Sequence, residues 1–201
     1  MTMIERRNWS QIRDEQGVSL ITVMMVILIM TLMGISILAV TGFERQISSA
    51  VSASEGASAA AESCVSTGAN VLLAVYDNSG IVPAAVLANA VPPGPVPVAN
   101  AAVLQSEVYL DGGNLDFPVG VGSVPNLVMT VGDPNTVGGY RVFGDIDRLY
   151  VNPVFGGSAG QTDHFYQITC VAQNAATGLT SQVGAVYVCN HSGAFCQRRT
   201  Y

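Results

Sequence analysis

Four cysteines carry the clearest chemistry in this sequence, and they stand at Cys64, Cys170, Cys189 and Cys196. Pairs of thiols can close disulfides, which small domains use in oxidising compartments to supplement a limited hydrophobic core. Four cysteines allow three connectivities, and free buried thiols are a further alternative. The cysteine positions alone therefore predict an extracytoplasmic domain without deciding the pairing.

The other residues that could do chemistry have no catalytic or metal-binding spacing. Residues 111–116 (DGGNLD) offer oxygen ligands for calcium, but the spacing is not that of an EF-hand loop, and we favour a polar turn. Asp145 and Asp147 alternate on a predicted strand, and we interpret them as solvated. His164 and His191 lie far apart in the sequence. Without a P-loop, a nucleophile elbow or a paired catalytic acid, we expect no enzyme, no cofactor and no metal site.

An uncharged run of 25 residues, 18–42, follows the charged N-terminal stretch. A helix needs roughly 20 apolar residues to cross a bilayer, so this run predicts a membrane span. A cleaved signal peptide has an apolar region of only roughly 7 to 15 residues. Small residues at Ser49, Ala50 and Ala53 keep signal cleavage open, and an uncleaved signal anchor is a stronger alternative.

The charges predict the orientation of this span. Arg6, Arg7 and Arg13 precede it, whereas only Arg45 follows it closely, and the positive-inside rule then places the N-terminus in the cytoplasm. The residues after position 17 contain five arginines, no lysine and eleven acidic residues. Such a negative balance does not fit a basic nucleic-acid surface, so we expect no nucleic-acid partner.

The helical pattern continues beyond the uncharged run. Apolar or small residues recur every three or four positions, as on one face of a helix, at Phe43, Ile47, Val51, Ser54, Ser58, Ala61, Val65, Gly68, Leu72 and Tyr76. No proline interrupts the chain before Pro83. We predict one helix from about Val18 to about Tyr76, whose first half requires lipid or other helices and whose second half requires a covering sheet.

The remaining chain, 77–201, is predicted to be one extracytoplasmic sheet domain. We expect a surface loop from 77 to about 102, because its segment 91–98 (VPPGPVPV) is too rich in proline for an interior strand. Strand candidates are 102–110, 127–131, 140–143 with a continuation to 151 left open, 164–173 and 180–189.

The last two strand candidates form the clearest hairpin, joined by the turn AATG at 175–178. If Asn174 lies opposite Leu179, the register places Cys170 opposite Val183. One face of this hairpin is then predicted to face the core, and its members are Tyr166, Ile168, Cys170, Val183, Ala185, Tyr187 and Cys189.

The same register bears on the disulfides. Cys189 falls opposite His164, so it lies too far from Cys170 for a disulfide, which requires Cα atoms within about 7 Å. Cys64 lies near the apolar stripe of the helix and can reach Cys170, while Cys189 and Cys196 can close the short loop CNHSGAFC. We prefer this pairing among the three connectivities.

Residues 13–65 resemble the N-terminal region of type IV prepilins, more specifically of PilX-type minor pilins. The resemblance lies in a charged leader ending in glycine, the segment GVSLITVMMVILIMTLMGISIL at 17–38, FERQISS at 43–49 and AAE at 60–62. It implies an α+β, type IV pilin-like fold, in which a long N-terminal helix packs on a small antiparallel sheet.

The resemblance also implies processing and partners. Residues 1–17 would be a prepilin leader, which prepilin peptidase removes by cleaving between Gly17 and Val18, and Val18 would become N-methylated. The helix 18–76 would hold the subunit in the bacterial inner membrane. Other minor and major pilins would be its partners in a filament that passes through the periplasm to the cell surface.

One position departs from the family pattern. Most major pilins carry glutamate at the fifth mature residue, where this sequence has Thr22. A subunit without that carboxylate suits an initiating or tip-associated place, as in the K-type pseudopilin of type II secretion, and a type II secretion minor pseudopilin is one alternative. Another alternative is an uncleaved, signal-anchored periplasmic binding or scaffold protein.

Overall fold

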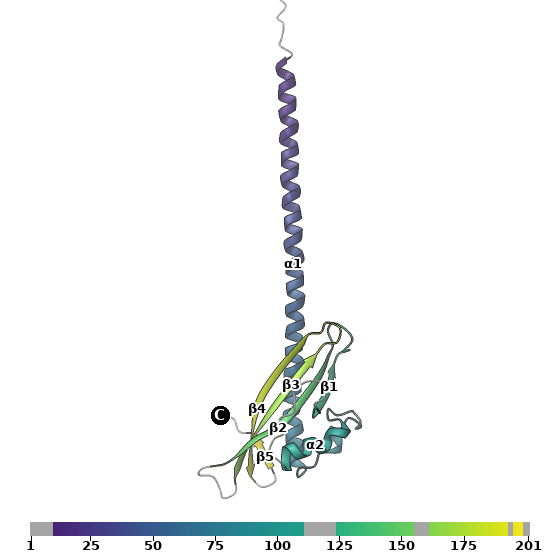
Figure 1. The fold of residues 1–201 in the computed structure, drawn as a ribbon, viewed down its shortest axis with the longest axis vertical. Helices are drawn as coiled ribbons and strands as arrows, with labels where there is room; N and C mark the ends of the chain where they lie inside the picture. The colour runs from purple at the N-terminus through teal and green to yellow at the C-terminus, as the bar shows by residue number, and fades with distance from the viewer. Residues whose placement is uncertain (1–9, 111–123, 155–160, 193–194, 199–201) are drawn as a thin grey trace, which may run out of the picture. The chain divides into compact units, whose positions relative to one another are not determined.

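The computed structural model describes residues 10–110, 124–154, 161–192 and 195–198. The chain divides into two compact units, Met1–Ala50 and Val51–Tyr201. Figure 1 shows the elements. In chain order they are α1 (Ser10–Asp77), the 3-10 turns η1 (Ala84–Val86) and η2 (Val98–Asn100), α2 (Ala101–Gln105), the π-helical turn η3 (Ser106–Leu110), and the strands β1 (Leu127–Val131), β2 (Tyr140–Pro153), β3 (Thr162–Gln173), β4 (Thr180–Ser192) and β5 (Phe195–Arg198).

Helix α1 is longer at its start than the sequence pattern predicted. It begins at Ser10, not near Val18, because the residues before the glycine are mostly good helix formers. Its end agrees with the prediction within one residue. There Ser79 has a positive φ of 57° and its N–H bonds to Tyr76 O at 3.0 Å, while Gly80 N–H bonds to Val75 O at 2.9 Å. These two bonds form a Schellman motif, which satisfies the last carbonyls and stops the helix.

The five strands form one antiparallel sheet in the order β1-β2-β3-β4-β5. The predicted hairpin register is confirmed, because Cys170 pairs with Val183 and His164 with Cys189. Asn174 N–H bonds to Leu179 O at 2.9 Å and closes the turn. Strand β2 runs on to Pro153, with a register shift between Arg148 and Tyr150.

The strand prediction for 102–110 was wrong, since this segment forms α2 and η3. Leu104 and Val108 are both fully buried, and their spacing of four residues is helical. An apolar run this short fits both the two-residue period of a strand and the 3.6-residue period of a helix. Here tertiary packing selects the helix.

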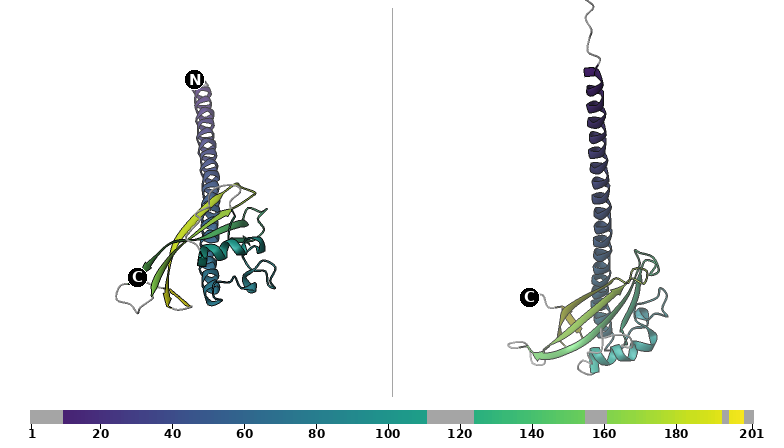
Figure 2. Two further views of the ribbon diagram at one scale, coloured as in Figure 1. Left: turned by 60° about the horizontal axis from the view of Figure 1, so that its bottom comes forward. Right: turned by 45° about the horizontal axis from the view of Figure 1, so that its top comes forward.

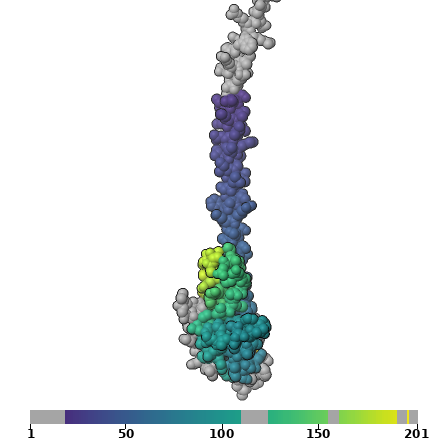
Figure 3. All heavy atoms as spheres, turned by 90° about the vertical axis from the view of Figure 1, so that its right-hand side faces the viewer, coloured from purple at the N-terminus to yellow at the C-terminus, as the bar shows by residue number. Residues whose placement is uncertain are grey.

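The segment expected to be a surface loop is largely exposed but is fixed at one point. Val91 is 98% exposed, whereas Val96 is fully buried. Val96 N–H bonds to Val86 O at 3.0 Å, and Ala88 N–H bonds to Val96 O at 2.8 Å. Figure 3 shows the described part of the chain between α1 and β1 (teal) next to the strands (green) on one face of the second unit.

The core of the second unit lies between the sheet and the last part of α1, and the views in Figure 2 show the sheet crossing this part of the helix. The fully or almost fully buried apolar residues of the helix are Ala57, Ala60, Ala61, Cys64, Val71, Leu72, Val75 and Tyr76. The predicted stripe is thus confirmed at Ala61, Leu72 and Tyr76, but Ser54 is exposed. Ser54 lies where the contact with the sheet begins, since Tyr140 Oη donates to Ala53 O at 2.9 Å, and its side chain stays outside that contact.

Candidate functional site

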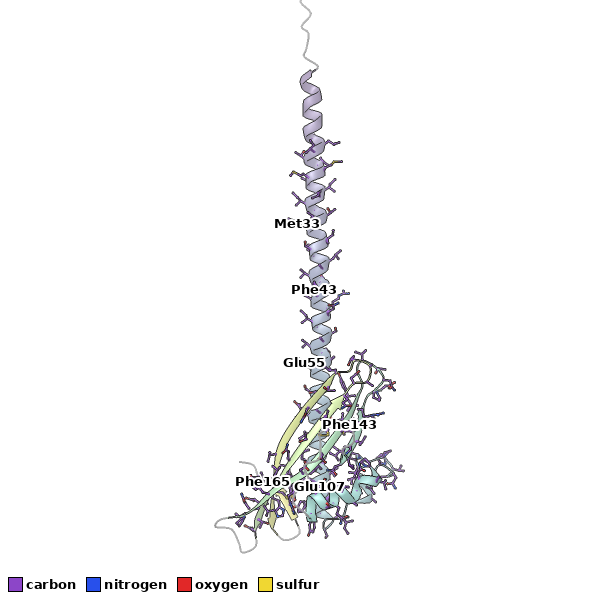
Figure 4. All side chains as sticks on the ribbon, in the orientation of Figure 1. Met33, Phe43, Glu55, Glu107, Phe143 and Phe165 are labelled. Carbon is purple, nitrogen blue, oxygen red and sulfur yellow. A yellow bond between two sulfur atoms is a disulfide. The ribbon has the colours of Figure 1, made fainter. Side chains whose placement is uncertain are left out.

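The N-terminal part of α1 is apolar on every side. Its large apolar side chains from Leu20 to Val40 are 47 to 75% exposed, and Figure 4 shows such side chains, Met33 among them, projecting all round the helix. Within the part of the chain that the structure describes, this is the one helix long and apolar enough to cross a membrane, with a mean hydropathy of 2.8 in its most apolar window. A helix that is hydrophobic all round belongs in lipid or among other apolar helices.

Four hydroxyl groups of this segment bond to the helix itself. At 2.8 to 2.9 Å, Thr22 donates to Ser19 O, Thr31 to Leu28 O, Ser36 to Leu32 O and Thr41 to Ile37 O. In hydrocarbon an unsatisfied polar group costs several kcal/mol, so such internal bonds suit a helix in lipid.

The predicted cleavage junction lies within α1. Gly17 and Val18 are helical, and the helix continues on both sides of them without a break. At Thr22, the predicted fifth mature position, Oγ1 donates its proton to Ser19 O at 2.9 Å. Thr22 thus offers neither a carboxylate nor a charge at this point of the helix.

The disulfide between Cys64 and Cys170 joins α1 to β3. Both cysteines are fully buried, and their Cα atoms are 6.1 Å apart. Gly144, which pairs with Cys170 across β2 and β3, leaves room for the bridge, because a Cβ at Gly144 would lie 2.6 Å from Cys64 Sγ. This is the pairing that the hairpin register favoured.

The second disulfide, Cys189–Cys196, closes the short loop between β4 and β5, with Cα atoms 5.2 Å apart. Cys189 is fully buried and Cys196 is 9% exposed. Together the two bridges match the preferred connectivity. They hold the helix and the C-terminal strand against the same sheet.

A hydrogen-bonded series of aromatic side chains, which sequence reasoning missed, fixes the end of α1. Tyr166 Oη donates to Val108 O at 2.8 Å, so the Tyr166 oxygen accepts the proton of Tyr76 Oη. The Tyr76 oxygen then accepts from His164 Nδ1 at 3.2 Å, and Thr162 Oγ1 lies 3.0 Å from His164 Nε2. This order of donors places a proton on Nδ1 of His164.

Both tyrosines of this series are kept neutral. Burial raises the pKa of Tyr166, and the neighbouring Tyr76 raises it further. Burial also raises the pKa of Tyr76, although its hydrogen bond with Tyr166 acts in the opposite direction. Neutral hydroxyls can donate and accept at once, as this series requires.

The expectation that Asp145 and Asp147 are solvated was wrong. They are 0% and 1% exposed, and Ile146 between them is also fully buried, so both faces of β2 are covered here. Asn126 Nδ2 donates to Asp145 Oδ1 and, at 2.6 Å, to Glu107 Oε2. Figure 4 labels Glu107 at the lower end of the sheet. In a strand where polar and apolar residues alternate, the polar residues are usually assigned to the solvent-exposed face. The sequence analysis therefore placed both aspartates in solvent.

The amide of Asn126 thus bridges two buried carboxylates, which gives this cluster a structural role. Within the described ranges, no group of three or more His, Cys, Asp and Glu side chains is placed to hold a metal ion. The expected polar turn at 111–116 and the side chain of His191 lie outside the described residues.

Comparisons of this chain with protein-family models, with curated proteins and with solved structures give no match. The functional argument therefore rests on the residues and their arrangement, chiefly on the exposed apolar helix, the sheet that covers residues 57–76, and the two disulfides.

Proposed function

We propose that this protein is a PilX-type minor pilin. In this proposal, the subunit is stored in the bacterial inner membrane with its N-terminus in the cytoplasm. Prepilin peptidase cleaves it between Gly17 and Val18, and the new terminus is methylated. The subunit then joins other minor and major pilins in a type IV pilus-like filament.

The observation that carries the proposal is an apolar stripe beyond the membrane span. Phe43, Ile47 and Val51 lie four residues apart on one helical face, and they are 66%, 63% and 50% exposed. Glu44 and Arg45 place this part of the helix outside the hydrocarbon. A simple anchor needs no exposed apolar stripe there, whereas a helix that packs against neighbouring helices in a filament does.

The test is analysis of the N-terminal peptide from cells with and without prepilin peptidase. We expect a new terminus at methylated Val18 only when the peptidase is present. Replacing Gly17→Leu should abolish cleavage, whereas Gly34→Leu, at a helical glycine with open space around it, should leave cleavage intact. A leader retained in both strains would overturn the proposal and favour an uncleaved signal-anchored binding or scaffold protein.

Thr22 supports a place at or near the filament tip in this proposal. A carboxylate at the fifth mature position would serve to pair with the terminal amine of a preceding subunit, and the Thr22 hydroxyl instead bonds to Ser19 O. An initiating subunit has no preceding amine to meet, which is also the situation of a type II secretion minor pseudopilin. Labelled filaments with equal numbers of tip and shaft sites would refute the tip assignment.

A further inference from the structure

The outer edge of β4 is paired with a neighbouring strand over only part of its length. On its inner side, β4 pairs with β3 from Thr180 to His191. On its outer side, β5 pairs only with Cys189–Ser192. Among the strands that the structure describes, none pairs with the outer edge at Gln182, Gly184 and Val186.

The ladder pattern identifies the backbone groups that face outward. Asn174 N–H bonds to Leu179 O, so this pair belongs to the hydrogen-bonded class of an antiparallel ladder. Because the class alternates, residues 183 and 185 direct their backbone groups toward β3. Gln182, Gly184 and Val186 then direct their N–H and C=O groups outward.

Within the described residues, this edge carries none of the features that usually protect a strand edge from pairing with another strand. Residues 180–188 (TSQVGAVYV) contain no charged residue and no proline, and Val186 is 61% exposed. Native proteins usually guard an exposed edge with charges, proline, bulges or a covering segment. The opposite edge has such a cover, since Val128 N–H on β1 bonds to Pro95 O at 2.7 Å.

An apolar groove runs beside this edge, between α1 and β4 in the second unit. Its volume is about 380 Å³. Its lining includes Val65, Ala69 and Leu73 of α1 and Ala185, Val186 and Tyr187 of β4. None of the described residues that line it is charged, so the groove suits small apolar side chains.

We propose that an extended, uncharged segment of a neighbouring chain adds to the outer edge of β4 as a further strand. It would continue the sheet where β5 ends, and its alternate side chains would enter the groove against α1. The outward ladder at Gln182, Gly184 and Val186 recognises an extended backbone, and the neutral lining selects against charged side chains. That the neighbour is another filament subunit rests on the proposed function.

Residue-resolved hydrogen exchange tests the proposal on the full chain. The samples are native membranes from cells with and without prepilin peptidase, compared with the purified chain in detergent at low concentration. We expect the amides of residues 182, 184 and 186 to exchange at least about tenfold more slowly in native membranes than in the purified chain. The amides of 183 and 185, already bonded to β3, should be protected in every sample.

A matched pair of variants tests the backbone contact. Val186→Pro removes an outward N–H without touching the β3 ladder, whereas Val186→Thr keeps this N–H and a similar shape. We expect the membrane-dependent protection of 182 and 184 to disappear in Val186→Pro and to persist in Val186→Thr. Formation of both disulfides and protection of 183 reports that each variant is folded. Ala185→Lys, which places a charge at the groove, is a second disruptive variant.

The outcomes separate this inference from the proposed function. Protection in both strains would support strand addition before any processing, even if the leader is never cleaved. Unprotected amides at 182, 184 and 186 in every sample would overturn the inference, even if Val18 becomes the methylated terminus. Protection in the purified chain would also overturn it, because this chain would then cover its own edge, or pair with a second copy if the protection grows with concentration.

Discussion

The two parts of α1, residues 20–40 and 57–76, differ in the size and exposure of their side chains. Residues 20–40 carry large apolar side chains that remain about half exposed or more. Residues 57–61 instead use small side chains, and Ala57 and Ala61 are fully buried. At Gly68 a Cβ would lie 2.9 Å from Ile168 Cγ2, so the sheet needs the bare helix backbone there. Large apolar side chains suit an environment of lipid or other apolar helices, whereas small side chains allow a sheet to pack close to the helix backbone.

This difference shows that a membrane span accounts for only the first part of the helix. A membrane span would be complete within roughly 20 residues. The second part is stabilised by the sheet, the Cys64–Cys170 bridge and the hydrogen bond between Tyr76 and Tyr166. Changes that loosen the sheet should therefore leave membrane insertion intact, and changes in the span should leave the sheet folded.

The largest expected effect is loss of the bridge between α1 and β3. The double variant Cys64→Ser/Cys170→Ser opens a loop of 106 residues. In the chain-entropy account this should lower the free energy of unfolding of the second unit by about 4 to 5 kcal/mol. Denaturant unfolding of the purified full chain measures the loss, while the fraction of the chain in the membrane should not change.

The control for this experiment is the short bridge. Cys189→Ser/Cys196→Ser opens a loop of only seven residues, so its loss should be smaller, about 2 to 3 kcal/mol. If both double variants lose the same stability, loop closure does not explain what the long bridge contributes.

Much of the division of α1 into an exposed apolar part and a part covered by the sheet could be predicted from the sequence, because it depends on local patterns. The uncharged run, the spacing of Leu72 and Tyr76, and the turn after Asn174 specify the helix and the hairpin register. The register in turn favoured the observed partner of Cys170. These features depend on neighbours in the chain or on one pair of strands.

What failed depends on contacts that no local pattern encodes. Asp145 and Asp147 were expected to be exposed to solvent, because an alternating pattern is interpreted as a strand with one buried and one solvent-exposed face. In the structure, β2 is covered on both faces at this point. The segment 102–110 was expected to be a strand, but its short apolar run fits a strand or a helix, and the packing of Leu104 and Val108 selects the helix. The bridge from Asn126 to Glu107 joins positions 19 residues apart, and no motif signals it.

The next largest effect concerns the first part of the helix. Met30 is 69% exposed in the middle of the apolar run, and Met30→Arg should cost about 3 kcal/mol for insertion. Alkaline extraction of membranes should then release a larger fraction of the chain. Gln46→Arg, beyond the span, is the matched control and should not change the extracted fraction. Equal release of both variants would show that residues 18–42 do not lie in lipid.

A moderate effect is expected from the aromatic series in the second part. Tyr166→Phe removes the donor to Val108 O and the acceptor for Tyr76, and should lower the free energy of unfolding by about 1 to 3 kcal/mol. Tyr150→Phe is the control, since Tyr150 is 50% exposed and should change stability by less than about 0.5 kcal/mol.

The pH dependence sharpens the same test. Because folding raises the pKa of Tyr166 above its ordinary value of 10.0, its contribution is complete below pH 10 and decreases as the pH rises above it. Stability should therefore decline above pH 10, and less steeply in Tyr166→Phe. An unchanged slope in this variant would show that Tyr166 ionisation does not contribute to the decline.

The smallest effect on stability should accompany a large effect on assembly. Phe43→Ala/Ile47→Ala truncates two exposed side chains of the stripe beyond the span, so unfolding of the second unit should change by less than about 0.5 kcal/mol. If this stripe packs against neighbouring helices, the variant should still be cleaved at Gly17 but should be several-fold depleted from sheared filaments. Ser49→Ala, on the opposite side of the helix, should be incorporated normally. Normal incorporation of the double variant would remove the observation on which the filament proposal depends, because the stripe would then have no partner there.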